Sequence, residues 1–281
     1  MANFQHRKIL RRRIFYICLL VIFSAAASFM VSFYFDKTAN ADITPSEESA
    51  VESETESASE SDNNTSSSQA EQENPLHMIP VAHISGENQL STGCELVSAM
   101  MLLNHYGIST TADQIVSRTP KVSLLSEGGS VYGMSPNQAF IGDPRSSDGL
   151  GCYATVLTAV VNSYFWDNDE KEAVNLTGTE LTQLAQDYLS KGSPVIIWAT
   201  VDMKDPTPGP SWILADTNET FQWISGEHCL LMVGFDEERY YFNDPYDLTG
   251  VKSYSKSVVE ERYRQMGKQA VAVRDIADAA A

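Results

Sequence analysis

Residues 228–243 read His-Cys-Leu-Leu-Met-Val-Gly-Phe, then Asp-Glu-Glu, then Arg-Tyr-Tyr-Phe-Asn, and this stretch decides the fold class. Two apolar runs of strand length separated by three acidic residues predict neighbouring antiparallel strands joined by a turn. Another buried strand is predicted at 194–201, where Pro-Val-Ile-Ile-Trp-Ala-Thr-Val is almost entirely apolar. The C-terminal half of the chain is therefore expected to form a sheet.

The preceding residues have the apolar spacing of helices. Helices are predicted at 94–104, 111–117, 152–165 and 176–190, with another at 258–266 and short strands at 78–81 and 270–273. Residues 119–150 are rich in Gly, Ser and Pro, which predicts an irregular excursion of the kind that shapes a site. Helices followed by strands predict an α+β fold.

Charge is distributed unevenly along the 281 residues, which carry 19 Lys and Arg against 37 Asp and Glu, a net charge of -18. A protein that binds nucleic acid must bring basic side chains to the phosphates, so this acidity argues against a nucleic-acid partner. Residues 1–13 are the exception, because they contain five basic residues and no acidic one.

An uncharged stretch, residues 14–35, follows the basic segment and is long enough to cross a bilayer as a helix. The positive-inside rule places the basic residues 1–13 in the cytoplasm and everything after residue 35 outside. We expect a single-pass signal-anchor with an extracellular C-terminal domain. Ala39-Asn40-Ala41 is also a small-x-small cleavage pattern, so a secretory signal peptide cleaved near Ala41 is the alternative.

A polar linker is predicted at 36–75, because residues 42–74 hold ten acidic residues, no basic residue and hardly an aliphatic one. Such a segment cannot bury enough apolar surface to offset the entropy of ordering it, so we expect disorder. Residues 76–281 then form the folded domain.

Cofactor and metal motifs are missing from the sequence. No nucleotide-binding loop, H-E-x-x-H motif or CxxC pair is present, and the histidines are scattered. Asp167-Asn168-Asp169 lacks the glycine and later ligands of a calcium loop. We expect neither a cofactor nor a metal.

Three cysteines, Cys94, Cys152 and Cys229, follow the apolar stretch, and their odd number leaves at least one thiol without an intramolecular disulfide. Cys94 and Cys152 each follow a glycine and open a predicted helix, where unpaired N–H groups stabilise a thiolate. This argument alone does not separate the two.

A nucleophilic thiol needs a histidine base that is held in turn by a carboxylate or amide. His228 opens the first predicted hairpin strand, and the second ends at Asn243-Asp244, so either residue could lie beside the imidazole. Cys229 would face the opposite side, in the core. Gln89, five residues before Cys94, could share an oxyanion with the Cys94 N–H.

Several segments of the chain resemble, in order, the papain-like cysteine peptidases related to the bacteriocin-processing, double-glycine leader peptidases, known as cysteine peptidase family 39. The segments are Gly93-Cys94-Glu95 with its helix to Gly107, 140–145, 149–153, 192–200, 227–234, 240–245 and 266–270. The resemblance implies a papain-like fold, with the cysteine in the helical part and the histidine and aspartate on an antiparallel sheet.

The same resemblance implies Cys94 as nucleophile, His228 as base and then acid, Asp244 as the orienting carboxylate, and Cys152 as structural. Gln89 departs from the papain-like pattern, whose glutamine lies six or more residues before the cysteine. The expected function is hydrolysis of peptide or protein substrates by a monomer through a thioester. The alternatives are a thioester-forming transferase or amidase, or a surface domain that binds peptide without cleaving it.

Overall fold

The computed structural model describes residues 77–86, 89–167, 170–248 and 250–277. The predicted basic segment, membrane-spanning stretch and linker at 1–75 lie outside these residues. No helix within the described ranges combines the length and apolar character needed to cross a bilayer.

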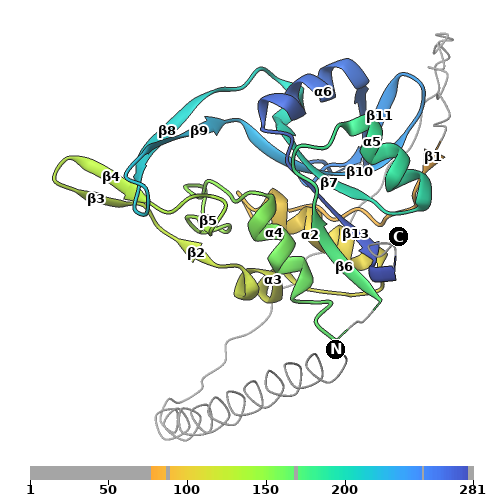
Figure 1. Ribbon diagram of the computed structural model, residues 1–281, viewed down its shortest axis with the longest axis horizontal. Coiled ribbons are helices and arrows are strands. Elements are labelled where there is room, and N and C mark those ends of the chain that lie inside the picture. The colour runs from red at the N-terminus through yellow and green to blue at the C-terminus, as the bar shows by residue number, and fades with distance from the viewer. Residues whose placement is uncertain (1–76, 87–88, 168–169, 249, 278–281) are drawn as a thin grey trace, which may run out of the picture. The chain divides into compact units, whose positions relative to one another are not determined.

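An antiparallel sheet of seven strands forms the centre of the described domain, in the order β12-β11-β10-β7-β13-β6, with β1 paired to β10 (Figure 1). All of its pairings are antiparallel. The strands are β1 (His77–Met78), β6 (Lys171–Asn175), β7 (Val195–Thr200), β10 (Glu227–Phe235), β11 (Arg239–Asn243), β12 (Val251–Ser255) and β13 (Ala270–Asp275).

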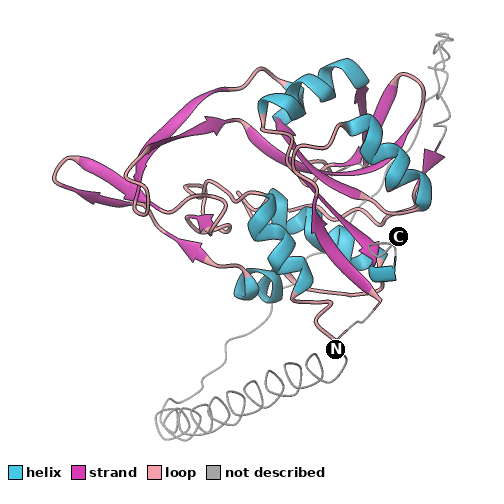
Figure 2. Cartoon of the chain, viewed as in Figure 1, coloured by secondary structure: helices cyan, strands magenta, loops and turns pink. Residues whose placement is uncertain are grey.

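Helices cover both faces of this sheet (Figure 2). They are α2 (Cys94–His105), α3 (Ala112–Arg118), α4 (Ala154–Asn162), α5 (Leu181–Asp187) and α6 (Lys256–Gln265), with short 3₁₀ turns at Leu189–Lys191 and Val201–Met203. Along β7, Ile196 and Trp198 pack into the core shared with α2 and α4. Val195 and Ile197 pack into the core shared with α5 and α6. Burial on both faces explains why β7 is apolar throughout.

A second, four-stranded sheet lies at the left of Figure 1, in the order β3-β4-β8-β9. Its strands are β3 (Leu125–Glu127), β4 (Ser130–Gly133), β8 (Thr207–Leu214) and β9 (Thr220–Ser225). Trp212 and Trp223 form a separate small core there with Ile141. Two further strands, β2 (Lys121–Val122) and β5 (Phe140–Ile141), pair in parallel.

The expected α+β class is confirmed, and the main elements form near their predicted positions. Residues 119–150 were expected to be irregular, but they contain four short strands. The helix predicted at 176–190 is shortened to Leu181–Asp187, and β6, β8, β9 and β12 were not predicted. Two prolines interrupt the pattern of β8, and its pairing with β9 shifts register between Pro208 and Ser211, as expected where proline cannot donate to a ladder.

Candidate active site

Cys94 is the first residue of α2, and the first ten residues of this helix are buried against the central sheet. The preceding residue, Gly93, makes no side-chain cap, so the first N–H groups of the helix have no capping partner from it. The sequence thereby places the thiol where the chain turns into a buried helix.

His228 and Asp244 meet at the end of the β10–β11 hairpin. His228 is the second residue of β10, and Asp244 directly follows β11, which pairs antiparallel with β10. The distance from Nε2 of His228 to Oδ1 of Asp244 is 2.7 Å, and both side chains are almost fully buried. Asn243, the other candidate partner, donates instead to the carbonyl of Val81 at 3.0 Å.

The Asp244 carboxylate is surrounded by donors. Besides His228, the Tyr246 N–H donates to Oδ1 at 2.9 Å and Lys252 lies 3.3 Å from Oδ2. Burial alone would raise the pKa of Asp244, but the hydrogen bond and charge of His228, with help from Tyr246 and Lys252, lower it well below its usual range. Asp244 is therefore ionised at neutral pH.

The other ring nitrogen of His228, Nδ1, is buried and has no hydrogen-bond partner among the described residues. The Cys94 thiol receives a backbone hydrogen bond from Cys229, the residue directly after His228, and donates to Oε2 of Glu95 at 3.5 Å. The thiol thus lies against the backbone that carries the imidazole. A histidine held through Nε2 with Nδ1 free is arranged as a general base.

The resting charge of Cys94 differs from the expectation based on the helix N-terminus. Burial, followed by the nearby carboxyls of Glu95 and Glu227, raises the pKa of this thiol well above its ordinary value. Cys94 therefore rests as a neutral thiol, and forming the nucleophile requires a base to remove its proton.

Tyr246 covers the imidazole, and the sequence analysis did not identify it. Its ring stacks on His228 with centroids 4.5 Å apart, and its hydroxyl donates to the Ser91 carbonyl at 3.3 Å. The available signal was an aromatic residue two positions after Asp244. Glu95 and Glu227, which flank Cys94 and His228 in the chain, were also given no role.

Cys94 opens into a pocket of about 220 Å³. The walls come from the start of α2, the 149–150 loop, β8–β9 and the residues around His228. They are Thr92, Cys94, Gly149, Leu150, Pro210, Trp223, Ser225, Gly226, Glu227 and Tyr246. Trp198 and Trp212, by contrast, are buried core residues.

The remaining cysteines lie behind the walls of this pocket. Cys152 and Cys229 are fully buried, and neither lines the pocket. Cys152 is held by its backbone, because its N–H donates to Glu95 at 2.7 Å and its carbonyl accepts from the Trp198 indole at 3.0 Å. All three cysteines of the described domain are free. The structure therefore separates Cys94 from Cys152, which their shared position at a helix start could not do.

Gln89 is not brought together with the other candidates. Its side chain is exposed and does not line the Cys94 pocket, while its backbone N–H donates to the carbonyl of Gly86 at 3.1 Å. Among the described residues, the one group of closely spaced potential metal ligands consists of Cys94, Glu95 and Glu227.

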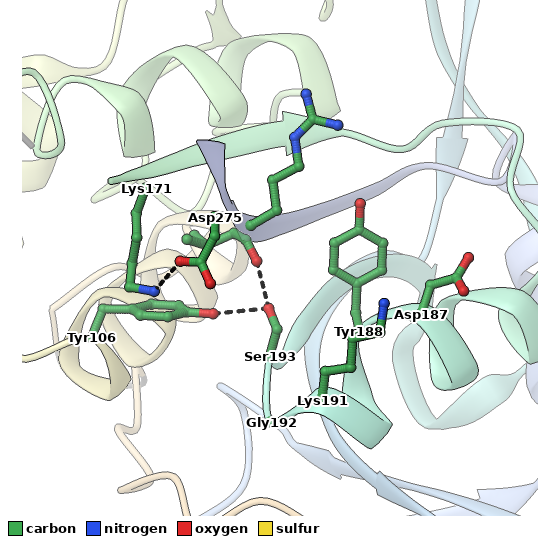
Figure 3. A pocket seen from close by; sticks show the side chains of 10 residues that line it. Tyr106, Lys171, Asp187, Tyr188, Lys191, Gly192, Ser193 and Asp275 are labelled. Atoms are coloured by element: carbon green, nitrogen blue, oxygen red, sulfur yellow. Dashed lines mark hydrogen bonds and ion pairs between the residues drawn. The ribbon is translucent and has the colours of Figure 1, made fainter. Parts of the chain in front are cut away.

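A larger pocket, about 440 Å³, lies at the other end of α2 (Figure 3). Its polar groups are largely paired with one another: Tyr106 donates to Ser193 at 2.8 Å, Ser193 donates to the Val273 carbonyl at 2.7 Å, and Lys171 bonds Asp275. The bonds of Tyr106 and Ser193 tie the end of α2 to β13, and the Lys171–Asp275 bond joins β6 to β13, so we assign the pocket a structural role.

The buried thiol, the imidazole and the paired carboxylate on an α+β scaffold define the class of cysteine peptidase-like proteins. A model of the Peptidase_C39 like family matches residues 80–271, and the chain belongs to this family.

The chain is also similar to individual proteins. Protein YvpB of Bacillus subtilis (strain 168), itself uncharacterized, is 30% identical over 186 residues, which cover 66% of this chain and 70% of YvpB. A C39-like peptidase from Bacillus anthracis has a TM-score of 0.61 at 25% identity, covering 70% of this chain and 97% of that one. The double glycine motif protease of an AMS/PCAT transporter, solved with a leader peptide, is 15% identical with a TM-score of 0.40, covering 71% and 94%.

Proposed function

We propose that the domain hydrolyses peptide bonds through a thioester on Cys94, with His228 as base and then acid and Asp244 as the residue that orients the imidazole. The observation that carries the proposal is the buried His228–Asp244 hydrogen bond of 2.7 Å, which leaves Nδ1 of His228 without a hydrogen-bond partner among the described residues. Membership of the Peptidase_C39 like family supports it.

In the first half-reaction, His228 takes the proton of the neutral Cys94 thiol as sulfur bonds to the carbonyl carbon of the substrate. The carbonyl oxygen becomes an oxyanion, to which the Cys94 N–H at the start of α2 can donate a hydrogen bond. When this intermediate collapses, the C–N bond breaks and His228 gives its proton to the leaving amine. Asp244 stabilises the imidazolium between these two transfers.

In the second half-reaction, His228 removes a proton from water, and the hydroxide attacks the thioester. Collapse breaks the C–S bond, releases the carboxylic acid and returns the proton to sulfur. Because both half-reactions use one acyl intermediate, an amine that replaces water would give a transferase.

The proposed activity is tested by incubating the full-length protein with a peptide library and identifying products by mass spectrometry. The wild type and Cys152→Ala should cleave at the same sites, whereas Cys94→Ala and His228→Ala should leave the library intact. Peptides joined to an added amine would assign the transferase alternative. Unchanged cleavage by Cys94→Ala would reject the thioester mechanism, and binding without cleavage by the wild type would support a peptide-binding domain.

We also propose that residues 14–35 anchor the protein in the membrane with the catalytic domain outside the cell. The support is the uncharged length of this stretch and the five basic residues before it. Protease added to intact cells should remove the domain while the N-terminal segment stays with the membrane. A domain protected until the cells are lysed would contradict this orientation, and a domain found in the medium would favour cleavage near Ala41.

A further inference from the structure

Two carboxyl groups lie against the Cys94 thiol without a basic partner. Glu95 follows Cys94 at the start of α2, and Glu227 precedes His228 at the start of β10. One oxygen of each carboxyl and the Cys94 sulfur all lie within 4.8 Å of one another. Within the described part of the chain, neither glutamate takes part in any ion pair. When both of these carboxyls are ionised, one fully buried and the other half-buried, they repel each other, so one of them is expected to keep a proton.

Their surroundings differ, and this difference decides which of them keeps a proton. Glu95 is fully buried and accepts the Cys152 N–H at 2.7 Å on one oxygen and the Cys94 thiol at 3.5 Å on the other. Oε1 of Glu227 is buried without a hydrogen-bond partner among the described residues. Burial raises the pKa of Glu95 to about 7, although the hydrogen bond from the Cys152 N–H acts to lower it. Burial, and then the nearby Glu95 carboxyl, raise the pKa of Glu227 well above its usual range.

We propose that Glu227 is a further catalytic residue, whose protonated carboxyl donates a hydrogen bond to the oxyanion that forms when Cys94 attacks the substrate. This inference rests on the proposed peptidase function and adds to it a second oxyanion donor beside the Cys94 N–H. A carboxylic acid kept neutral by its surroundings is a strong donor to a developing negative charge.

The position of Glu227 fits this role better than that of Gln89. Glu227 lines the pocket that contains Cys94, and one of its carboxyl oxygens lies within 4.8 Å of the sulfur. Gln89 is exposed and outside that pocket. A donor must lie about 2.7–3.1 Å from the oxyanion, so a side chain in the wall of the pocket satisfies the requirement and an exposed one outside it does not.

The electrostatic surroundings preserve the proton that the donor needs. Apart from its chain neighbour His228, the titratable groups that interact with Glu227 become negative when they ionise. They are Cys94, Glu95, Cys152, Tyr153, Cys229 and Tyr246. No cation among them favours ionisation of Glu227, so the donor is lost only at higher pH.

The test compares Glu227→Gln, which keeps an N–H donor, with Glu227→Ala, which does not; both remove the ionisable group. With a peptide that the full-length wild type cleaves, Glu227→Ala should lower kcat by about 10²–10³-fold with little change in KM. Glu227→Gln should stay within about tenfold of the wild type. Gln89→Ala should cleave at the wild-type rate.

Two further measurements separate an oxyanion donor from a structural role. Alkylation of Cys94 by iodoacetamide forms no oxyanion, so Glu227→Ala should be alkylated at least as fast as the wild type, because the Glu227 carboxyl also raises the pKa of the thiol. The wild-type kcat should fall at alkaline pH as Glu227 loses its proton, and this fall should be absent in Glu227→Gln because an amide does not titrate. The pH comparison needs only Glu227→Gln, so it decides the matter even where the alanine variant does not fold.

Wild-type kcat in a folded Glu227→Ala would overturn the inference. A fall of kcat at alkaline pH that is unchanged in Glu227→Gln would overturn it as well. So would a loss of kcat of about 10²–10³-fold in Gln89→Ala, the size expected for Glu227→Ala. Failure of the underlying peptidase proposal looks different, because Cys94→Ala would then cleave like the wild type whatever happens at position 227.

Discussion

At the scale of single residues, the site depends on one carboxylate that stays ionised in a buried position. Asp244 does so because His228 and the Tyr246 N–H donate to it and the Lys252 ammonium lies 3.3 Å away. In turn, the carboxylate fixes which nitrogen of His228 faces it and leaves Nδ1 for the thiol.

Replacing Asp244 by Asn should therefore lower kcat by about 10²–10⁴-fold, because the amide leaves the imidazolium without a compensating charge. Asp247→Asn is the matched control, since Asp247 also lies 3.3 Å from Lys252, whereas the carboxylate that bonds the His228 imidazole is that of Asp244. Steady-state kinetics of peptide cleavage measure both variants. Equal kcat values for Asp244→Asn and Asp247→Asn would show that the buried carboxylate does not act through His228.

At the scale of elements, the site is built where the start of α2 meets the start of β10. Gly151 lies beside this junction with φ of +151°, and a Cβ there would press into the Glu95 carboxyl and lie 3.1 Å from Trp223. The absent side chain therefore leaves the room in which Glu95 accepts the Cys152 N–H.

Gly151→Ala should reduce both stability and activity, whereas Gly178→Ala should affect stability alone. Gly178 also has a positive φ, +97°, but an added Cβ there meets nothing within 4 Å. The collision at Gly151 should cost about 1–3 kcal/mol more than the backbone strain that both variants share. Urea unfolding gives the stability difference, and peptide cleavage gives the activity. If the two variants are equally stable and active, the packing described around Glu95 is wrong.

Elements with a clear apolar pattern could be predicted from the sequence. The predicted strand Arg239–Asn243 has the observed bounds, and the helix from Cys94 is longer by one residue. Because the hairpin was predicted, so was the approach of Asn243 or Asp244 to His228, and in the structure Asp244 is the residue that bonds the imidazole. Strands β6 and β8 could not be found in this way, since β6 is short and largely polar and β8 contains two prolines.

The pairing of Glu95 with Glu227 was beyond sequence reasoning for a different reason. The two lie 132 positions apart, and only the packing of α2 against β10 brings them together. The sequence shows that Glu95 follows Cys94 and that Glu227 precedes His228, so each glutamate is next to a candidate catalytic residue. Nothing in the pattern showed that their side chains turn toward the same space.

At the scale of the whole molecule, the two kinds of buried carboxyl give stability an opposite dependence on pH. The pKa of Asp244 is lowered on folding, so its contribution is present above the unfolded value of about 3.9 and is lost as pH falls through the folded value. The pKa of Glu95 is raised to about 7 on folding. Between its unfolded pKa and about 7, the folded state binds more protons, so stability falls as pH rises.

The described domain should therefore be most stable at weakly acidic pH, at about pH 4–5. Between this maximum and pH 7, the proton that Glu95 retains in the folded state lowers the free energy of unfolding by at most roughly 3 kcal/mol, at about 1.4 kcal/mol per pKa unit. Urea unfolding of the full chain from pH 3 to pH 8 measures the curve, and Glu95→Gln should flatten its neutral limb. A curve that rises steadily to pH 8 would contradict the neutral state of these carboxyls.

The central claim is that Cys94 is the nucleophile and that His228 activates it. A chloromethyl ketone built on a cleaved peptide sequence tests it most directly, with intact mass and peptide mapping as the readout. We predict a single adduct on Cys94 of the full-length protein, unaffected by Cys152→Ala, absent in Cys94→Ala and formed much more slowly in His228→Ala. An adduct on another residue, or one that forms on Cys94 equally fast without His228, would contradict the account.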